Sequence, residues 1–226
     1  MLHQIASDIW HTQHGFTVNG VRVSSRMTVV RMKSGGLWLH SPVPLTDAVR
    51  AQLTRLGEVQ YIVAPSKTHH FFVKECIAAF PQAKLFGAPG LLAKRPDLSG
   101  MTELKPVVEP DWQDDFEQIF FEGIPYANET VWFHKASGTL IMTDLCQWWQ
   151  GDMPWPARLY ARLTGVRHAL AVPHTVRSLV RNKAAAHVSA QKILQWPVQR
   201  VIVAHNAVIE DDAHAKLQLA LARFAS

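Results

Sequence analysis

The sequence contains little cysteine and no long hydrophobic run. Only two of its 226 residues are cysteines, Cys76 and Cys146, which is too few for the disulfide framework of a small secreted domain. No stretch approaches the roughly 20 consecutive apolar residues that a membrane-spanning helix needs. The first residues, MLHQIASDIW, do not have the pattern of a signal peptide. We therefore expect a cytoplasmic protein that does not insert into a membrane.

The sequence also lacks internal repeats, low-complexity tracts and any segment that resembles a linker. Hydrophobic residues make up 48% of the chain and charged residues 18%, a composition that excludes intrinsic disorder. A chain of this length without a linker predicts a single domain over residues 1–226, with a sizeable core.

The charge balance is mildly basic, with a formal net charge of +5. Such an excess attracts anionic substrates or nucleic acid. The densest basic cluster, residues 158–183, interleaves its cations with Leu, Val and Ala, which is also typical of a solvated helix face. We therefore expect a small-molecule partner. We do not expect nucleic acid to be the partner, although the basic isoelectric point is compatible with it.

The hydrophobic pattern of the first half predicts strands followed by alternating helices and strands. Turn signals at Asn19-Gly20 and Ser34-Gly35-Gly36 divide the opening strands. The expected strands cover residues 5–10, 16–23, 27–32, 37–40, 59–64 and 84–88, and the expected helices residues 46–56, 71–80 and 90–94. Strands that alternate with helices are typical of parallel-sheet units.

The second half begins with strands and ends mainly in helices. A hairpin is expected around the turn Lys135-Ala136-Ser137-Gly138, and its second arm runs directly into Asp144. The expected strands cover residues 116–121, 130–134, 139–143 and 198–204, and the expected helices residues 157–163, 175–181, 184–195 and 211–224.

Three of the predicted strands are followed by residues that can bind metals. His69 and His70 follow YIVA, Asp144 follows TLIMT, and His205 follows VIVA. Ligands gather beyond the carboxyl ends of strands in α/β sheets, so these side chains are candidates to converge. Imidazoles with a carboxylate suit Zn or Fe. The alternatives are a surface pair of histidines, a helix-capping aspartate and a buried, hydrogen-bonded histidine, in a chain with 12 histidines.

The order of these motifs resembles the metallo-β-lactamase superfamily over most of the chain. The matching segments are SGGLWLHSP, the strand–Pro–His–His step of YIVAPSKTHHFF, the hairpin that ends in TLIMTD, and RVIVAHN. The resemblance implies an α/β fold, the αββα sandwich of two mixed β-sheets with helices on the outer faces. It also implies that Asp144 is the metal-bridging aspartate and His205 the last ligand histidine, which glycine usually follows. The pattern IVAPxKxHH, with PxxNE and TD further on, resembles the uncharacterised DUF4336 branch.

The chain departs from the superfamily's His-x-His-x-Asp-His loop. When the final histidine is aligned with His70, Pro65 and Lys67 occupy the positions of the first two histidines, and His69 that of the aspartate. The histidine expected near Pro125, before the hairpin, is also absent. These differences imply that one of the two metal positions is lost. The other would use His69, His70, Asp144 and His205 to bind one Zn or Fe ion.

Three further features are candidates for a role at this site. Lys67 would supply positive charge where the first metal stood, and Glu129 would act as a ligand or general base beside Asp144. The alternatives are a surface lysine on a turn and a glutamate at a strand edge. The Trp-rich segment 147–155 is a candidate lid, and His168 and His174 are candidates to support the ligands.

Three functions remain open at this point. The first is a hydrolase-like enzyme with a degenerate site, in which at most one metal ion activates water for attack on an ester, amide or phosphoester. The second is a non-catalytic, metal-free member of the same fold that binds a ligand or a partner. Nucleic-acid processing, suggested by the basic charge, is a third and less favoured reading.

Overall fold

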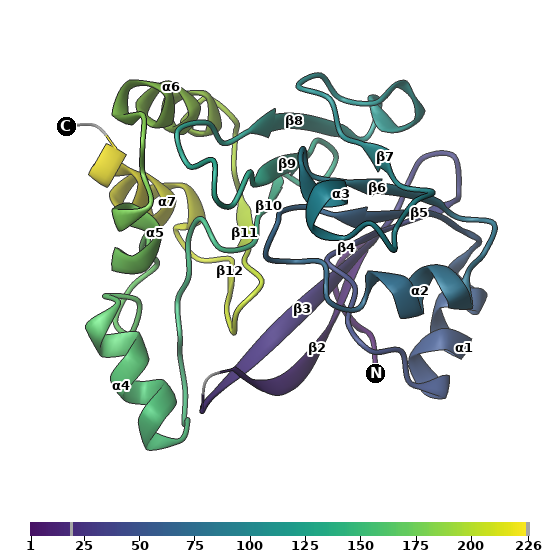
Figure 1. The fold of residues 1–226 in the computed structure, drawn as a ribbon, viewed down its shortest axis with the longest axis horizontal. Coiled ribbons are helices and arrows are strands. Elements are labelled where there is room, and N and C mark those ends of the chain that lie inside the picture. Colours follow the sequence, from purple (N-terminus) through teal and green to yellow (C-terminus); the bar gives the residue numbers. More distant parts are fainter. Residues whose placement is uncertain (19, 225–226) are drawn as a thin grey trace.

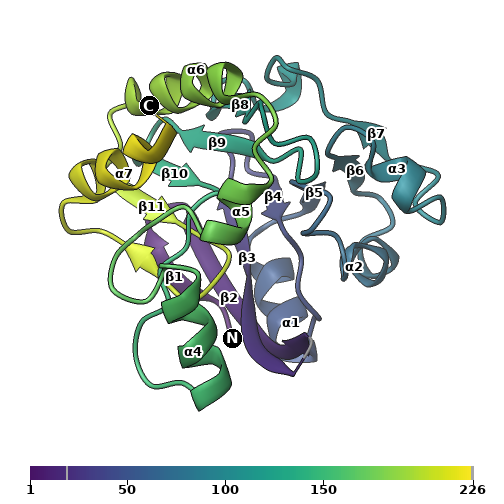
Figure 2. The same ribbon diagram turned by 60° about the vertical axis from the view of Figure 1, so that its left-hand side comes forward.

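Two β-sheets packed face to face form the centre of the molecule, and helices cover their outer faces (Figures 1 and 2). A computed structural model describes residues 1–18 and 20–224. Both sheets are mixed, because each contains parallel and antiparallel neighbours. The expected αββα sandwich is therefore confirmed.

The first sheet comes from the N-terminal half and has its strands in chain order. Its strands are β1 (His3–Ala6), β2 (Ile9–Val18), β3 (Val21–Arg31), β4 (Leu37–His40), β5 (Val59–Ala64), β6 (Lys84–Gly87) and β7 (Thr102–Glu103). Neighbours are antiparallel from β1 to β4 and parallel from β4 to β7. Helices α1 (Asp47–Leu56), α2 (Val73–Ala79) and α3 (Leu91–Lys94) connect the parallel strands.

The second sheet has the order β12-β11-β10-β9-β8. Its strands are β8 (Phe116–Phe120), β9 (Thr130–His134), β10 (Thr139–Ile141), β11 (Arg200–Ile202) and β12 (Val208–Ile209), and only the β10–β11 pair is parallel among those described. The remaining helices are α4 (Trp155–Leu163), α5 (His174–Ser178), α6 (Lys183–Leu194) and α7 (Ala213–Leu221), with short 3-10 turns η1 (Pro110–Trp112) and η2 (Ala222–Phe224).

An aromatic layer joins the two sheets. Trp38 of the first sheet packs against Phe116 and Trp132 of the second, with ring centroids 4.6 and 5.3 Å apart. All three side chains are fully buried. Burial of a side chain of this kind stabilises the fold by about 2 kcal/mol. The sheets therefore have a rigid interface, and the loops at their edges are held in fixed positions.

The helices and strands follow the predicted order, with one clear difference near the N-terminus. Three short strands were expected over residues 5–32, whereas β2 and β3 form one long hairpin paired from Ile9↔Val30 to Val18↔Val21. Polar residues in the middle of both strands interrupt the apolar pattern, but the backbone pairing continues through them. Gly20 takes a positive φ of 79° at the turn, and Asn19 lies outside the described residues.

Three loops at one edge of the sandwich carry the candidate site. They follow β5, β10 and β11, at the carboxyl ends of these strands.

No helix in the described part of the chain is long and apolar enough to cross a membrane.

Candidate metal centre

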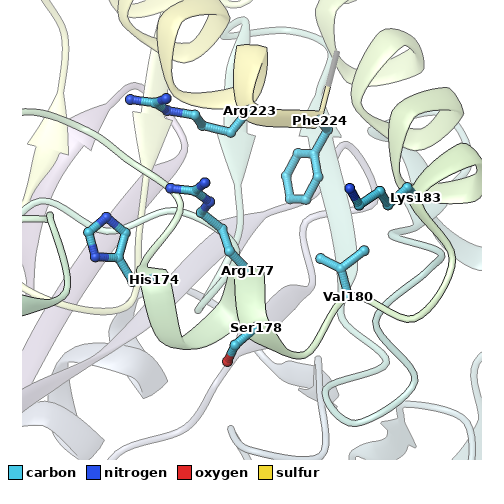
Figure 3. Close-up of a pocket in the computed structure, with 7 residues that line it drawn as sticks. All are labelled: His174, Arg177, Ser178, Val180, Lys183, Arg223 and Phe224. Atoms are coloured by element: carbon cyan, nitrogen blue, oxygen red, sulfur yellow. The ribbon is translucent and has the colours of Figure 1, made fainter. Parts of the chain in front are cut away.

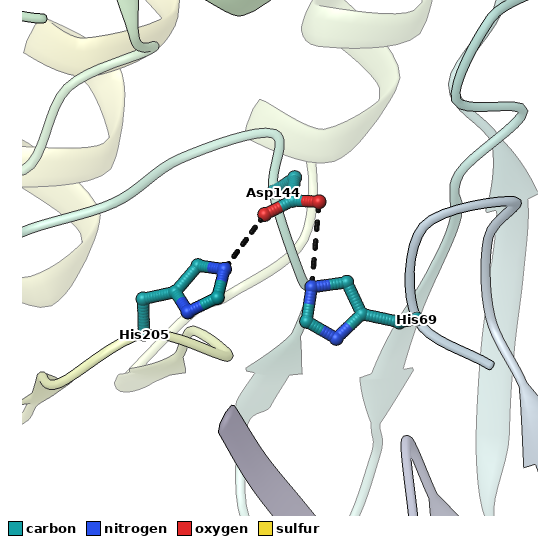
Figure 4. Close-up of side chains that lie close together, drawn as sticks. All are labelled: His69, Asp144 and His205. Atoms are coloured by element: carbon teal, nitrogen blue, oxygen red, sulfur yellow. Dashed lines mark hydrogen bonds and ion pairs between the residues drawn. The ribbon is translucent and has the colours of Figure 1, made fainter. Parts of the chain in front are cut away.

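The loops after β5, β10 and β11 bring His69, Asp144 and His205 together (Figure 4). One ligand atom from each residue lies within 4.8 Å of the other two. Nε2 of His69 is 3.3 Å from Oδ2 of Asp144, and Nε2 of His205 is 3.0 Å from Oδ1. Residues that are 61 to 136 positions apart in the sequence thus form one cluster around a single carboxylate.

A buried carboxylate holds the loop that presents Asp144. Glu129 precedes β9, and its two oxygens accept hydrogen bonds from the backbone N–H groups of Thr143, Asp144 and Leu145, at 2.5, 3.0 and 2.9 Å. Burial and the nearby charge of Asp144 raise the pKa of Glu129 to about 7. Because both oxygens are occupied by the backbone, Glu129 orients Asp144 and does not itself enter the cluster.

The carboxylate of Asp144 has four polar partners. Besides the two histidines, Oδ2 accepts a hydrogen bond from the Thr68 hydroxyl at 2.8 Å, and Oδ1 accepts one from Nε2 of Gln147 at 3.0 Å. Burial favours the neutral acid, but His69 and His205 outweigh it and hold the pKa of Asp144 well below its usual range. Asp144 is therefore an anion in a precisely defined orientation.

The tautomer of His205 is fixed by the backbone. Its Nδ1 is hydrogen-bonded to the carbonyl oxygen of Ser24, which can only accept, so the Nδ1 atom carries a proton. In a neutral ring Nε2 then presents a lone pair to the carboxylate of Asp144, and two acceptors face each other at 3.0 Å. A cation must lie between them: either a second proton on the ring or a metal ion.

The protonated form of His205 is stabilised when no metal is bound. Burial lowers the pKa of the ring, but the hydrogen bond and negative charge of Asp144 outweigh burial, so the pKa of His205 is raised. A proton and a metal ion would therefore compete for the same nitrogen.

His69 is oriented by Ser41, the residue that follows β4. Its Nδ1 lies 2.9 Å from the hydroxyl of Ser41, which leaves Nε2 directed at Asp144. Ser41 is buried and has a left-handed φ of 53°, a conformation that costs free energy in a non-glycine residue. The strained turn after β4 thus places a hydroxyl where it fixes the ring of His69.

The three side chains fit one transition-metal ion. Two imidazole nitrogens and one carboxylate oxygen are a normal donor set for Zn or Fe, and both rings have their other nitrogen engaged by a serine. The separations of 3.0 and 3.3 Å join each ring to a different oxygen of Asp144, and the ligand atoms of the three residues all lie within 4.8 Å of one another.

His70 lies outside the cluster. Its Nδ1 is 3.0 Å from Nη1 of Arg95, which can only donate, so the proton of the neutral ring is on Nε2. Burial and the nearby charges of Lys94 and Arg95 lower the pKa of His70 to about 4. A neutral ring protonated on Nε2 offers no lone pair there, and Nε2 is buried without a partner among the described residues.

The other sequence candidates have different surroundings. Nζ of Lys67 donates to the carbonyl oxygen of Pro125 at 3.3 Å, and Lys67 does not line the cavity around Asp144. His174 bonds to the carbonyl oxygen of Leu163 and lines another cavity. His168 is exposed. The structure thus directs none of these three side chains toward Asp144.

A cavity of about 310 Å³ opens onto the cluster. Its polar lining residues include His69, Asp144 and His205. Six aromatic residues also line it: Phe16, Phe71, Phe72, Tyr126, Trp149 and Tyr160. From the Trp-rich segment, Trp149 forms part of the wall, whereas Trp155 is exposed.

The segment 147–150 is fixed to the His205 loop. The side chain of Asn206 accepts a hydrogen bond from the N–H of Gln150 and donates one to its carbonyl oxygen, at 3.0 and 3.1 Å. Asn206 has a φ of 66°, a left-handed conformation that asparagine tolerates better than most residues. Asparagine can therefore occupy this position, at which glycine is usual in the superfamily that the sequence resembles.

A family model described as a domain of unknown function, DUF4336, matches residues 6–159, which is more than half of the chain. The chain belongs to the DUF4336 family. The matched range includes His69, Glu129 and Asp144, whereas His205 lies beyond it. No curated protein matches this DUF4336 protein in sequence.

Solved structures of metallo-β-lactamases are similar to this DUF4336 protein in fold. A metallo-β-lactamase from Pontibacter korlensis is 15% identical with a TM-score of 0.67, and the match covers 100% of this chain and 99% of the other. One from Hirschia baltica is 8% identical with a TM-score of 0.63, over 98% and 97%. A metal-soaked flavodiiron core from Synechocystis sp. PCC6803 is 11% identical with a TM-score of 0.68, over 99% and 60%. At these identities the likeness establishes the metallo-β-lactamase fold alone.

Sequence reasoning missed the polar residues that orient the cluster. Thr68 and Gln147 both donate to Asp144, and Ser41 contacts His69. Each is close in sequence to a predicted ligand or a predicted strand end, which is the only signal that pointed to it. Short polar side chains are common in loops, so their direction becomes evident only in the folded chain.

Proposed function

We propose that this DUF4336 protein binds one Zn or Fe ion through His69, Asp144 and His205 and acts as a metal-dependent hydrolase. The observation that carries the proposal is the geometry of His205. Its Nδ1 is committed to a backbone carbonyl, and its Nε2 faces the carboxylate of Asp144 at 3.0 Å. A bound metal would supply Lewis-acid chemistry, lowering the pKa of water and polarising a substrate oxygen.

One metal ion is supported better than two. At the positions of the superfamily's first two histidines, Pro65 has no donor side chain and Lys67 is bonded to the carbonyl of Pro125. His70 has its Nδ1 engaged by Arg95. We therefore propose three protein ligands, with Thr68 and Gln147 holding Asp144 and Ser41 holding His69.

The cavity favours substrates with an apolar or aromatic part. Six aromatic side chains line it together with the polar groups of the cluster around Asp144. An ester or amide with an aromatic group would bury that group against these rings and place its polar bond beside Asp144. A phosphoester is less well matched, because Lys94 is the one cation of Lys or Arg type among the lining residues described.

Metal analysis with a matched pair of variants tests the proposal. The protein is dialysed against Zn, Fe or Mn and then against buffer, and its metal content is measured. We expect about one equivalent in the wild type and in the exposed-residue control Asp152→Ala, and loss of metal in Asp144→Ala. Hydrolysis of 4-nitrophenyl esters is measured on the same samples and should follow the metal content. A folded wild type that retains none of the three metals would contradict the proposal.

A metal-free binding protein is the alternative, and one observation favours it. The carboxylate of Asp144 already has four partners, which is its full hydrogen-bonding capacity. A protonated His205 would complete such a network without a metal. Under this alternative, aromatic ligands bind the cavity equally well in the presence of a strong chelator, and no hydrolysis occurs. The single domain over residues 1–226, the cytoplasmic location and the small-molecule partner stay predictions.

A further inference from the structure

A second cavity, of about 550 Å³, is lined by cations that come from three separate elements (Figure 3). Arg177 belongs to α5, Lys183 begins α6, and Arg223 belongs to η2. His174 also lines the cavity. No acidic residue is among the lining residues that the structure describes.

The three cations have no acidic partner within residues 1–18 and 20–224. None of the ion pairs or side-chain hydrogen bonds found there involves Arg177, Lys183 or Arg223. Elsewhere on the surface, Arg31, Arg95 and Arg200 each pair with a carboxylate. Among residues 1–18 and 20–224, no carboxylate therefore compensates the positive charge of the basic cavity.

Two of the cations extend in the same direction. The guanidinium groups of Arg177 and Arg223 point to the side of the cavity on which His174 lies, whereas Lys183 lies on the other side, beyond Phe224 (Figure 3). The start of α6 adds to the positive potential, because Lys183 is its first residue and its first turn contains no acidic residue. Guanidinium groups bind phosphate in a bidentate manner, which makes a pair of them suited to a phosphoryl group.

The cavity also has an apolar part. Phe224 and Val180 line it next to the cations, and the ring of Phe224 is largely buried. Its volume is sufficient for a ligand larger than a free phosphate ion. We propose that the basic cavity between α5, α6 and η2 binds an organic phosphate, whose phosphoryl group is held by Arg177 and Arg223.

The basic cavity shares α5 with the cavity system around Asp144. Thr175 and Val176 line a smaller cavity of about 180 Å³ that also contains Glu129 and Asp144. His174, Arg177 and Ser178 line the basic cavity. An anion at Arg177 would thus contact the same short helix that forms a wall near Asp144, without touching the proposed metal ligands.

Calorimetric titration with pyrophosphate tests the inference. Wild-type protein is compared with the double variant Arg177→Ala/Arg223→Ala and with the control Arg50→Ala/Arg55→Ala, which removes the same charge from two exposed positions of α1. We expect the Arg177→Ala/Arg223→Ala variant to bind at least about tenfold more weakly than the wild type, because two charge-assisted interactions are lost. The control variant should stay within about twofold of the wild type, since distant exposed charges are screened by salt.

Two outcomes would overturn the inference. Equal weakening in both double variants would show that net charge alone attracts the anion, and no heat of binding at millimolar pyrophosphate would show that the cavity is not an anion site. The titration is run on metal-free protein, so pyrophosphate has no metal ion to bind at Asp144, and the result is independent of the proposed function. Circular dichroism of both variants establishes that the exposed substitutions leave the fold intact.

Discussion

Helix α5 lies between two cavities whose charged groups are arranged in different ways. On one side, Asp144 is surrounded by two histidines, a hydroxyl and an amide, and every oxygen of the carboxylate has partners. On the other side, Arg177, Lys183 and Arg223 line a cavity without an acidic residue among those described. Loss of one member of a cluster with paired charges destabilises the folded protein even without a ligand. A cluster of like charges instead lets a ligand of opposite charge stabilise the folded protein when it binds.

The substitution Asp144→Ala should have the largest effect on stability. It removes the carboxylate acceptor of the partly buried His205 and Thr68 and of the buried Gln147, so the free energy of unfolding of the metal-free protein should fall by about 3 kcal/mol. Urea denaturation measures this loss. The exposed carboxylate Asp152 serves as the control, and an Asp152→Ala variant should lose less than about 0.5 kcal/mol. An Asp144→Ala variant as stable as the control would show that the cluster is not compensated as described.

Glu129→Gln should have the next largest effect. A glutamine side chain has one oxygen in place of two and directs an N–H group at the backbone N–H groups of residues 143–145, so we expect a loss of about 2 kcal/mol. Urea denaturation of Glu122→Gln, at an exposed position nearby, provides the comparison. Metal affinity should fall as well, since the loop that presents Asp144 is no longer held. Unchanged stability together with abolished hydrolysis would instead indicate that Glu129 is a catalytic base.

Arg177→Ala should have the smallest effect. Removal of one cation from the basic cavity relieves repulsion by Lys183 and Arg223, and we expect the free energy of unfolding to change by no more than about 0.5 kcal/mol. In 10 mM pyrophosphate the wild type should have a higher melting temperature than the Arg177→Ala variant, because the anion binds the folded state of the wild type more tightly. Thermal denaturation with and without pyrophosphate measures both. A loss above about 1.5 kcal/mol without the anion would show that Arg177 has a structural role.

The fold and the position of the cluster could be predicted because both depend on local patterns. Apolar runs and turn residues define the strands, and the carboxyl ends of strands meet at one edge, which brought His69, His70, Asp144 and His205 together in the prediction. The long β2–β3 hairpin was harder to predict, because polar residues in its centre interrupt the apolar pattern although the backbone stays paired.

The direction of each side chain could not be predicted. His69 and His70 are adjacent, but Nδ1 of His70 contacts Arg95, 25 positions later in the sequence, whereas Nδ1 of His69 contacts Ser41, 28 positions earlier. The basic cavity could not be predicted either. Its cations lie in three separate elements, and the basic segment 158–183 was interpreted from the sequence as a solvated helix face. Such arrangements result from tertiary packing, which no local pattern encodes.

Zinc affinity of two neighbouring variants tests the central claim most directly. His69→Ala and His70→Ala are compared with the wild type by competition against a chromogenic chelator. The wild type should bind about one equivalent, His69→Ala should bind at least about tenfold more weakly, and His70→Ala should stay within about threefold of the wild type. If His70→Ala loses zinc while His69→Ala retains it, or if the wild type binds no zinc, the proposed centre of His69, Asp144 and His205 is contradicted.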